Sequence, residues 1–224
     1  MTEVQVVKLK ESILEDNDAD AQLLRDTLKA QKTCLINLMS SPGSGKTATL
    51  LALNRYFDGR IRWGVMEADI DSDVDARIMR AAGVPAVQLH TGGMCHLDAD
   101  MTRQGIKALE AETGVLDLIV LENVGNLVCP AEFDTGAAIN MTILSVPEGD
   151  DKPAKYPLMY ETCDILVINK IDACAVFDFD FDRVEKSAKI CNENIKTFPV
   201  SAKTGKGVEA LADELLARIR EWNA

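Results

Sequence analysis

Hydrophobic and polar residues follow a helical period in the first part of the chain. Between residues 11 and 31, the apolar positions are mostly spaced as on one face of a helix, and charged residues occupy the opposite face. The spacing predicts an amphipathic helix, and we expect residues 1–31 to pack as a helical segment on the domain that follows. The apolar positions are Ile13, Leu14, Ala21, Leu24 and Leu28.

From residue 32 onward, continuous apolar runs alternate with helical patterns. The runs at 33–39, 61–68, 85–89, 116–123, 140–146, 164–170 and 195–201 predict strands, and the segments at 48–57, 73–82, 97–112, 181–194 and 207–222 predict helices. Three prolines, Pro147, Pro153 and Pro157, predict a loop. Continuous apolar strands separated by helices are typical of a parallel sheet covered on both faces. We therefore expect one α/β domain over residues 32–224.

Length and charge narrow the classes of function. A chain of 224 residues can bury a core, and its net charge of −12 opposes binding to nucleic acid. The first residues lack a basic segment followed by an apolar one, and no apolar run approaches the roughly 20 residues that cross a bilayer. We expect a cytoplasmic protein with no nucleic-acid or membrane partner, in which the six cysteines are poor disulfide candidates.

The segment SSPGSGKT, residues 40–47, lies between a predicted strand and a predicted helix. In a phosphate-binding loop, backbone N–H groups face the phosphates, a lysine reaches the β and γ oxygens, and a hydroxyl binds Mg²⁺. The context favours a P-loop NTPase over a plain glycine turn, although Ser40 replaces the usual first glycine. The predicted phosphate-binding residues are Gly43, Ser44, Gly45, Lys46, Thr47 and Ala48.

Two downstream segments at predicted strand ends indicate the base. VINKID supplies Asn169, Lys170 and Asp172, and VSAK supplies Ser201, Ala202 and Lys203. The Asp172 carboxylate can accept hydrogen bonds from the ring N–H and the exocyclic amine of guanine, whereas adenine presents no such donor pair. Two unrelated lysine turns would leave the ordered combination with the phosphate-binding loop unexplained. We expect GTP and GDP as ligands.

Carboxylates at strand ends are candidates for magnesium and for hydrolysis. Oxygen ligands suit Mg²⁺, and we expect Thr47, Asp69 and Glu122 to supply them. Gly125 follows Glu122 closely enough for its N–H to sense a γ-phosphate. We assign catalysis to Lys46 and Asp75, although Asp75 is also suited to cap a helix. Asn126 stands where many small GTPases have a glutamine, so hydrolysis should be slow.

Three residues form a candidate soft-metal site. Cys95 and His96 are adjacent in a glycine-rich loop, and Cys129 lies four residues beyond Gly125, predicted at the far end of a strand. Two thiolates and an imidazole suit Zn²⁺ or Ni²⁺ and leave an open position. On these residues alone, unlinked thiols are the stronger interpretation. The acidic run at 177–182 lacks the glycine and closing glutamate of a calcium loop and is better explained as a solvated turn.

Taken together, PGSGKT, GMCHLDA, ENVGNLVCPAEFD, PEGDDKPAKYP and INKID closely resemble the HypB family of hydrogenase-maturation nickel GTPases, from about Lys32 to the end. The resemblance implies that Cys95, His96 and Cys129 bind Ni²⁺ or Zn²⁺. It also implies GTP-dependent dimerisation and delivery of metal, with other maturation proteins, to the hydrogenase large-subunit precursor. The N-terminal C-x-x-C-G-C site and histidine-rich tract of some members are absent from this sequence.

Two alternatives remain open beside a nickel-delivering GTPase. One is a urease-type nickel GTPase, whose usual C-P-H metal motif this sequence lacks. The other is a metal-binding adaptor of the maturation machinery in which GTP is a structural ligand with negligible turnover. Phosphate release distinguishes the adaptor from both GTPases.

Overall fold

The computed structural model describes residues 9–69 and 73–224, with side chains described from residue 14. Within these residues, seven strands form one sheet in the order β3-β2-β4-β1-β5-β6-β7, and every neighbouring pair is parallel. The predicted α/β fold with a parallel sheet is confirmed. The strands are β1 Cys34–Ser40, β2 Trp63–Asp69, β3 Ala86–His90, β4 Leu118–Glu122, β5 Ile139–Ser145, β6 Ile165–Asn169 and β7 Lys196–Pro199.

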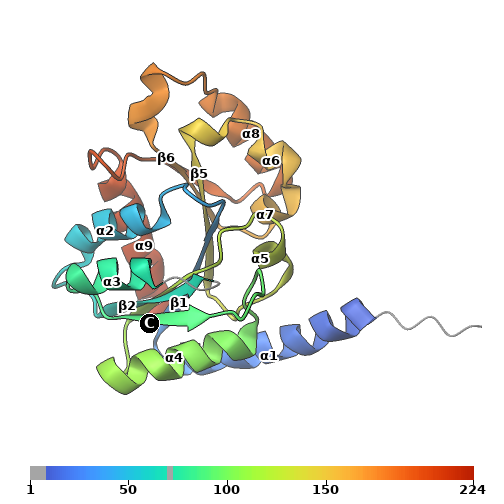
Figure 1. The fold of residues 1–224 in the computed structure, drawn as a ribbon, viewed down its shortest axis with the longest axis vertical. Coiled ribbons are helices and arrows are strands. Elements are labelled where there is room, and N and C mark those ends of the chain that lie inside the picture. Colours follow the sequence, from blue (N-terminus) through green and yellow to red (C-terminus); the bar gives the residue numbers. More distant parts are fainter. Residues whose placement is uncertain (1–8, 70–72) are drawn as a thin grey trace, which may run out of the picture.

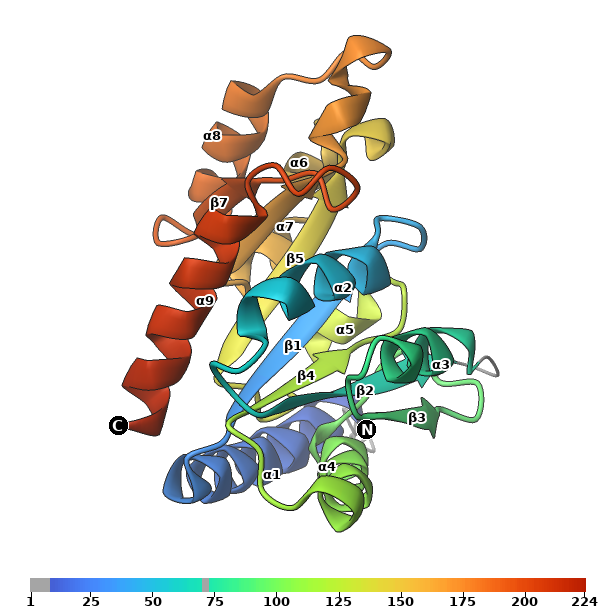
Figure 2. The same ribbon diagram turned by 90° about the vertical axis from the view of Figure 1, so that its left-hand side faces the viewer.

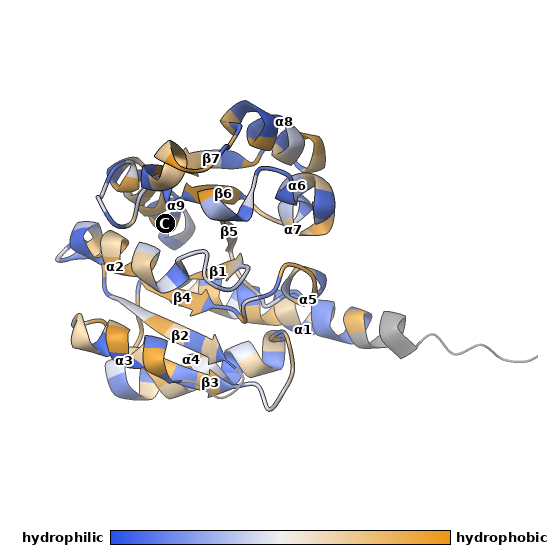
Figure 3. Cartoon of the chain, turned by 45° about the horizontal axis from the view of Figure 1, so that its top comes forward, coloured by the Kyte–Doolittle hydropathy of each residue, from blue (hydrophilic) through white to orange (hydrophobic). Residues whose placement is uncertain are grey.

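Helices cover both faces of the sheet (Figures 1 and 2). One face packs against α2 Lys46–Phe57, α3 Val74–Ala81 and α9 Val208–Asn223. The other face packs against α1 Leu9–Gln31 and α4 Ala99–Thr113 over β2 and β4, and against α7 Pro157–Glu161 and α8 Phe181–Cys191 over β5 and β6. Strands buried on both faces read as continuous apolar runs, and Figure 3 shows hydrophobic residues concentrated along them.

Helix α1 lies beside α4 in both views of the ribbon (Figures 1 and 2). Its Ala21, Leu24 and Leu28 side chains are buried, and Leu24 and Leu28 belong to the core cluster that contains Ile106 and Leu109 of α4. The predicted amphipathic helix is therefore present from Leu9, and residues 1–8 lie outside the described residues. The division of the chain at residue 31 stays a prediction.

The segment predicted as a proline-rich loop is instead partly helical. It forms the 3-10 helix η1 Val146–Glu148 and the short helices α6 Lys152–Lys155 and α7 Pro157–Glu161. Each of the three prolines occupies one of the first two positions of its helix. Proline lacks an N–H that these positions would not use, and its fixed φ suits a helix start, so here the prolines begin helices rather than exclude them.

Candidate functional site

The phosphate-binding loop connects the end of β1 to the start of α2 at the carboxyl edge of the sheet, where ligands bind in open α/β folds. Gly43 and Gly45 have φ of 76° and 101°, a region that favours glycine. Ser44 Oγ donates a hydrogen bond to the buried Ser40 Oγ over 2.6 Å. The hydroxyl of Ser40 thus stabilises the loop at the position where the usual first glycine is missing.

The NKID segment, at the end of β6, holds the phosphate-binding loop from across β5, which lies between β6 and β1 in the sheet. The buried Asn169 donates from Nδ2 to Ser44 O over 3.0 Å, and its Oδ1 accepts from Ala202 N over 3.1 Å. Lys170 Nζ donates to Gly43 O over 2.6 Å. A Cβ atom on Gly45 would lie 2.5 Å from Asn169 Nδ2, so only glycine permits this approach. The structure therefore brings the three predicted nucleotide segments together.

Asp172 lies at the exposed end of this group. Ser201 Oγ donates to Asp172 Oδ1 over 2.6 Å, and Thr204 N donates to Ser201 Oγ over 3.1 Å. The hydrogen bond from Ser201 lowers the pKa of Asp172, and Lys203 contributes in the same direction. Asp172 is therefore a charged acceptor, with its carboxylate fixed at one oxygen and exposed to solvent.

Carboxylates surround the first residues of α2. Thr47 Oγ1 lies 3.0 Å from Asp75 Oδ1 and 3.4 Å from Glu122 Oε1, and Lys46 Nζ lies 3.7 Å from Glu122 Oε1. The structure thus adds Asp75 to the magnesium candidates. Asp69 is the exposed last residue of β2, and its carbonyl oxygen accepts from Thr91 N over 3.3 Å.

Glu67 is a site residue that the sequence analysis did not assign. It is directly opposite Glu122 in the pairing of β2 with β4, and both side chains are buried. Burial raises the pKa of Glu67, and the neighbouring Glu122 raises it further. Burial also raises the pKa of Glu122, although Lys46 opposes the shift. The pair therefore retains a proton more readily than isolated carboxylates would; one glutamate within the apolar run of β2 was the only sequence signal.

Gly125 and Asn126 lie beside the phosphate-binding loop. A Cβ atom on Gly125 would lie 3.0 Å from Pro42 Cγ and 3.2 Å from Pro42 N, so the two segments are in close contact. Asn126 Oδ1 accepts from Val128 N over 2.8 Å, which stabilises its own loop. Glu148 of η1, another residue missed from the sequence, accepts hydrogen bonds from Ser41 and from Ser145 and so connects the phosphate-binding loop to the end of β5.

The two predicted thiol ligands, Cys95 and Cys129, meet in the structure. A hydrogen bond from the Cys95 thiol to Cys129 raises the pKa of Cys95, with burial as a smaller cause. Cys129 does not end a strand as predicted: β4 ends at Glu122, and Cys129 begins the short helix α5 Cys129–Glu132. Its neighbour Pro130 is suited to a helix start, which explains the difference.

His96 lies close to Cys95, but its ring packs against Phe133. Its Nδ1 is 3.9 Å from Cys95 Sγ, while its ring stacks on Phe133 with centroids 3.7 Å apart. Burial lowers the pKa of His96, which favours the neutral form that binds metals. Within the described residues, no three His, Cys, Asp or Glu side chains form a ready-made metal cluster. Binding through Cys95, His96 and Cys129 would therefore need a movement of side chains or a further ligand.

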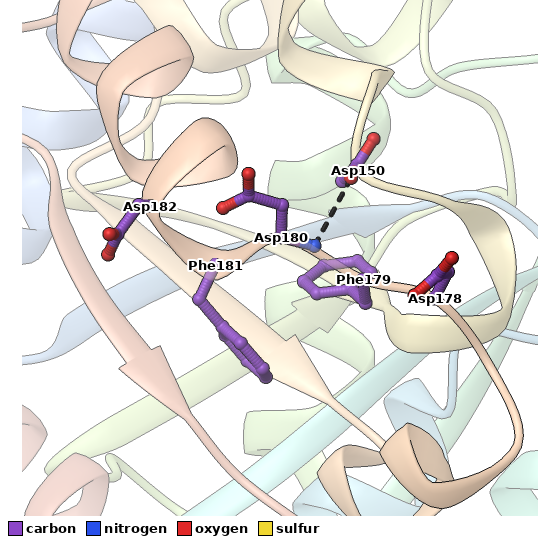
Figure 4. A pocket seen from close by; sticks show the side chains of 6 residues that line it. All are labelled: Asp150, Asp178, Phe179, Asp180, Phe181 and Asp182. Atoms are coloured by element: carbon purple, nitrogen blue, oxygen red, sulfur yellow. Dashed lines mark hydrogen bonds between the residues drawn. The ribbon is translucent and has the colours of Figure 1, made fainter.

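The acidic run at 177–182 forms a turn before α8 (Figure 4). Asp180 caps that helix by accepting from Arg183 N over 3.0 Å, and Asp150 accepts from Asp180 N over 3.2 Å and from Arg183 Nη1 over 2.9 Å. Figure 4 shows the carboxylates of Asp178, Asp180 and Asp182 pointing away from one another. Capping and ion pairing explain these residues.

Comparison with known proteins agrees with the fold and identifies the family. Residues 34–199 match the family described as CobW/HypB/UreG, nucleotide-binding domain. The hydrogenase maturation factor HypB of Azotobacter chroococcum is 44% identical over 93% of this chain and 68% of its own length. The hydrogenase/urease maturation factor HypB of Helicobacter pylori is 39% identical over 96% of this chain and 89% of its own length.

The similar solved structures are also HypB proteins. HypB from Helicobacter pylori in complex with nickel superimposes with a TM-score of 0.87 at 38% identity, over 92% of this chain and 96% of that one. HypB from Archaeoglobus fulgidus gives 0.82 at 33% identity, over 92% of this chain and all of that one. No helix among the described residues is long and apolar enough to cross a membrane. The chain belongs to the HypB family of hydrogenase maturation factors, within the CobW/HypB/UreG group of nucleotide-binding domains.

Proposed function

We propose that this protein binds GTP, hydrolyses it slowly to GDP and phosphate, and uses the cycle to control nickel delivery during hydrogenase maturation. The observation that carries the proposal is the set of contacts made by Asn169, which joins Ser44 of the phosphate-binding loop to Ala202 of the base segment. These contacts support the proposal because they hold the segments proposed to bind phosphate and guanine at one edge of the sheet. The nickel complex of the related Helicobacter pylori protein supports the choice of metal.

In hydrolysis, water attacks the γ-phosphorus and the bond to the β-γ bridging oxygen breaks, leaving GDP and phosphate. Lys46 would leave Glu122 to bind the β and γ oxygens and stabilise their charge. Asp75 lies next to Thr47 and is positioned to orient the water. Asn126 bonds its own loop rather than projecting freely, which agrees with a slow reaction.

The residues around Thr47 fit a magnesium ion. Glu122 Oε2 is buried without a hydrogen-bond partner, and Thr47 Oγ1 lies within hydrogen-bond distance of Asp75 and Glu122. Asp69 is at the end of β2, the strand that pairs with the one carrying Glu122. Thr47, Glu122 and one or both aspartates would hold Mg²⁺. When bound, this ion would neutralise charge on the phosphate oxygens.

Nickel or zinc would be the cargo, bound through Cys95, His96 and Cys129. Gly125, beside the phosphate-binding loop, is four residues before Cys129, so movement of the Gly125 amide toward a γ-phosphate can reach the thiolate through a short segment. The proposed partners are a second copy of the chain, hydrogenase maturation accessory proteins and the hydrogenase large-subunit precursor.

A metal-binding adaptor with GTP as a structural ligand is the second candidate. The local hydrogen bond of Asn126 favours it, because that bond engages the side-chain oxygen at the position where many small GTPases have a glutamine that orients water. The Helicobacter pylori relative is named a hydrogenase/urease maturation factor. Urease is therefore a further candidate recipient of the metal.

Phosphate release from purified protein distinguishes a GTPase from the adaptor. We expect steady release with GTP and Mg²⁺, and a loss of about 100-fold or more in Lys46→Ala, because the lysine stabilises transition-state charge. Lys206→Ala, an exposed lysine of the 205–207 turn, is the matched control. Equal rates in the wild type and Lys46→Ala would leave the adaptor as the function.

A further inference from the structure

Helix α1 contacts both segments that carry the predicted metal ligands. Cys95 and His96 precede α4, whereas Cys129 begins α5, about thirty residues later in the chain. Asn17 of α1 joins the two segments with a single side chain: its Oδ1 accepts from Ala99 N over 3.0 Å, and its Nδ2 donates to Asp134 O over 2.9 Å. An amide that uses both ends in this way fixes the distance between its two partners.

Further polar contacts of α1 hold the same segments. Arg25 donates from Nη2 to both oxygens of Asp134 over 2.7 Å, and from Nε to Ala137 O over 3.0 Å. On the other side, Arg103 of α4 forms an ion pair with Asp20. Ion pairs of a guanidinium with both oxygens of a carboxylate give fixed geometry as well as attraction.

The segment that carries Cys129 is not packed tightly on the side that faces α1 and the central strands. A polar cavity of about 330 Å³ lies between α1, the central strands and this segment, and Arg25, Asn37, Pro130 and Phe133 are among its lining residues. Close packing normally fixes a short helix. Here part of that packing is missing, so the hydrogen bonds from α1 contribute more to the position of α5.

We propose that α1 is a positioning element of the Cys95, His96 and Cys129 site, and that Asn17 is its main positioning residue, setting the separation of the two ligand segments. This inference rests on one part of the proposed function, which is that Cys95, His96 and Cys129 bind a soft divalent ion. The ligand is Ni²⁺ or Zn²⁺, and the role of Asn17 is indirect, since it contacts backbone atoms of each segment. Residues that orient metal ligands from outside the coordination shell commonly change affinity 10- to 100-fold.

Two substitutions separate the two hydrogen bonds of Asn17. Asn17→Leu removes both, while Asn17→Asp keeps the acceptor for Ala99 N and places a carboxylate against Asp134 O. The Ni²⁺ and Zn²⁺ dissociation constants of the full chain are measured anaerobically by competition with a chromophoric chelator, and the thiolate-to-nickel absorption band is recorded. Thr27→Ala, which removes only a hydrogen bond within α1, is the control on the same helix.

We expect metal binding about tenfold or more weaker in Asn17→Leu, with an altered absorption band, and an intermediate loss in Asn17→Asp. Thr27→Ala should match the wild type. Affinity for a non-hydrolysable GTP analogue should be unchanged in all three, because Ala99 and Asp134 lie outside the nucleotide segments. If both Asn17 variants fold and bind metal with wild-type affinity, the positioning role of α1 is wrong, and the proposed metal site is unaffected. Metal binding that survives Cys95→Ala with Cys129→Ala would instead overturn the proposed metal site.

Discussion

At the scale of single residues, two carboxyl side chains lie buried near the phosphate-binding loop. Glu67 and Glu122 face each other on adjacent strands, and each has one buried oxygen without a hydrogen-bond partner. Lys46 and Thr47 contact Glu122, so the residues expected to bind phosphate and Mg²⁺ are paired with this carboxylate. Bound nucleotide would draw Lys46 away and change the charge around the pair.

Replacing Glu67 should change how stability depends on pH. Its pKa rises from an ordinary 4.5 to about 10 in the fold. Between these values the folded state binds more protons than the unfolded state, so this group stabilises the fold fully below about pH 4.5, and that contribution is lost as pH rises toward 10. Gln resembles the protonated acid, and Glu67→Gln should therefore stabilise the nucleotide-free protein at pH 8 by roughly 1–3 kcal/mol.

Urea unfolding at pH 5.5 and pH 8 measures this effect. The variant should lose less stability than the wild type between the two pH values. Glu209→Gln, an exposed glutamate in the first turn of α9, should change neither value appreciably. An identical pH dependence in the wild type and Glu67→Gln would contradict the raised pKa.

Asp172 should decide which base is bound. Asn at this position offers a donor where guanine also presents donors, so GTP binding should weaken and xanthosine triphosphate should become the preferred ligand. A site with an unmatched polar group can discriminate by about 10⁴-fold. Competition binding with GTP, ATP and xanthosine triphosphate gives the ratios, and Asp178→Asn in the nearby acidic turn is the control. ATP competing as well as GTP against the wild type would make the guanine assignment wrong.

At the scale of elements, the central strands β1, β2, β4, β5 and β6 were predictable because burial on both faces makes each a nearly continuous apolar run. The edge strands β3 and β7 are only partly buried, and their patterns are correspondingly weaker. The long helices were predictable because each has one buried face. The short helices α5, α6 and α7 have four or five residues, too few to show a helical period, and each has a proline in its first two positions. A rule that treats proline as a loop signal fails at helix starts.

The site was predictable where a motif lies within one short segment. The phosphate-binding loop and the NKID segment carry their chemistry in consecutive residues, and the structure brings them together through Asn169. Glu67 and Asn17 act through partners distant in sequence, Glu122 and the pair Ala99 and Asp134, so no spacing pattern identifies them. The roles assigned to the nucleotide, magnesium and nickel residues stay predictions.

At the scale of the whole molecule, the proposed metal ligands lie where a second copy could reach them. Met94 and Val128 immediately precede Cys95 and Cys129, and these two residues are 45% and 49% exposed. Exposed apolar residues beside an incomplete ligand set suit an interface. A two-fold axis would bring the same residues of another copy alongside and could complete or bridge the shell.

We expect a GTP analogue and metal each to favour this symmetric dimer. The Gly125 segment links the γ-phosphate position to Cys129, so GDP should lose the coupling together with the γ-phosphate. Binding linkage requires that dimerisation strengthen GTP binding by the same factor by which GTP strengthens dimerisation, typically about 5- to 150-fold. Sedimentation velocity with GDP, with a non-hydrolysable analogue, and with the analogue plus nickel or zinc measures the monomer fraction, and Cys95→Ala controls for the metal. An equal monomer fraction in all three, at concentrations that bracket the dimer constant, would rule out the switch, because a nucleotide that drives association must change that fraction.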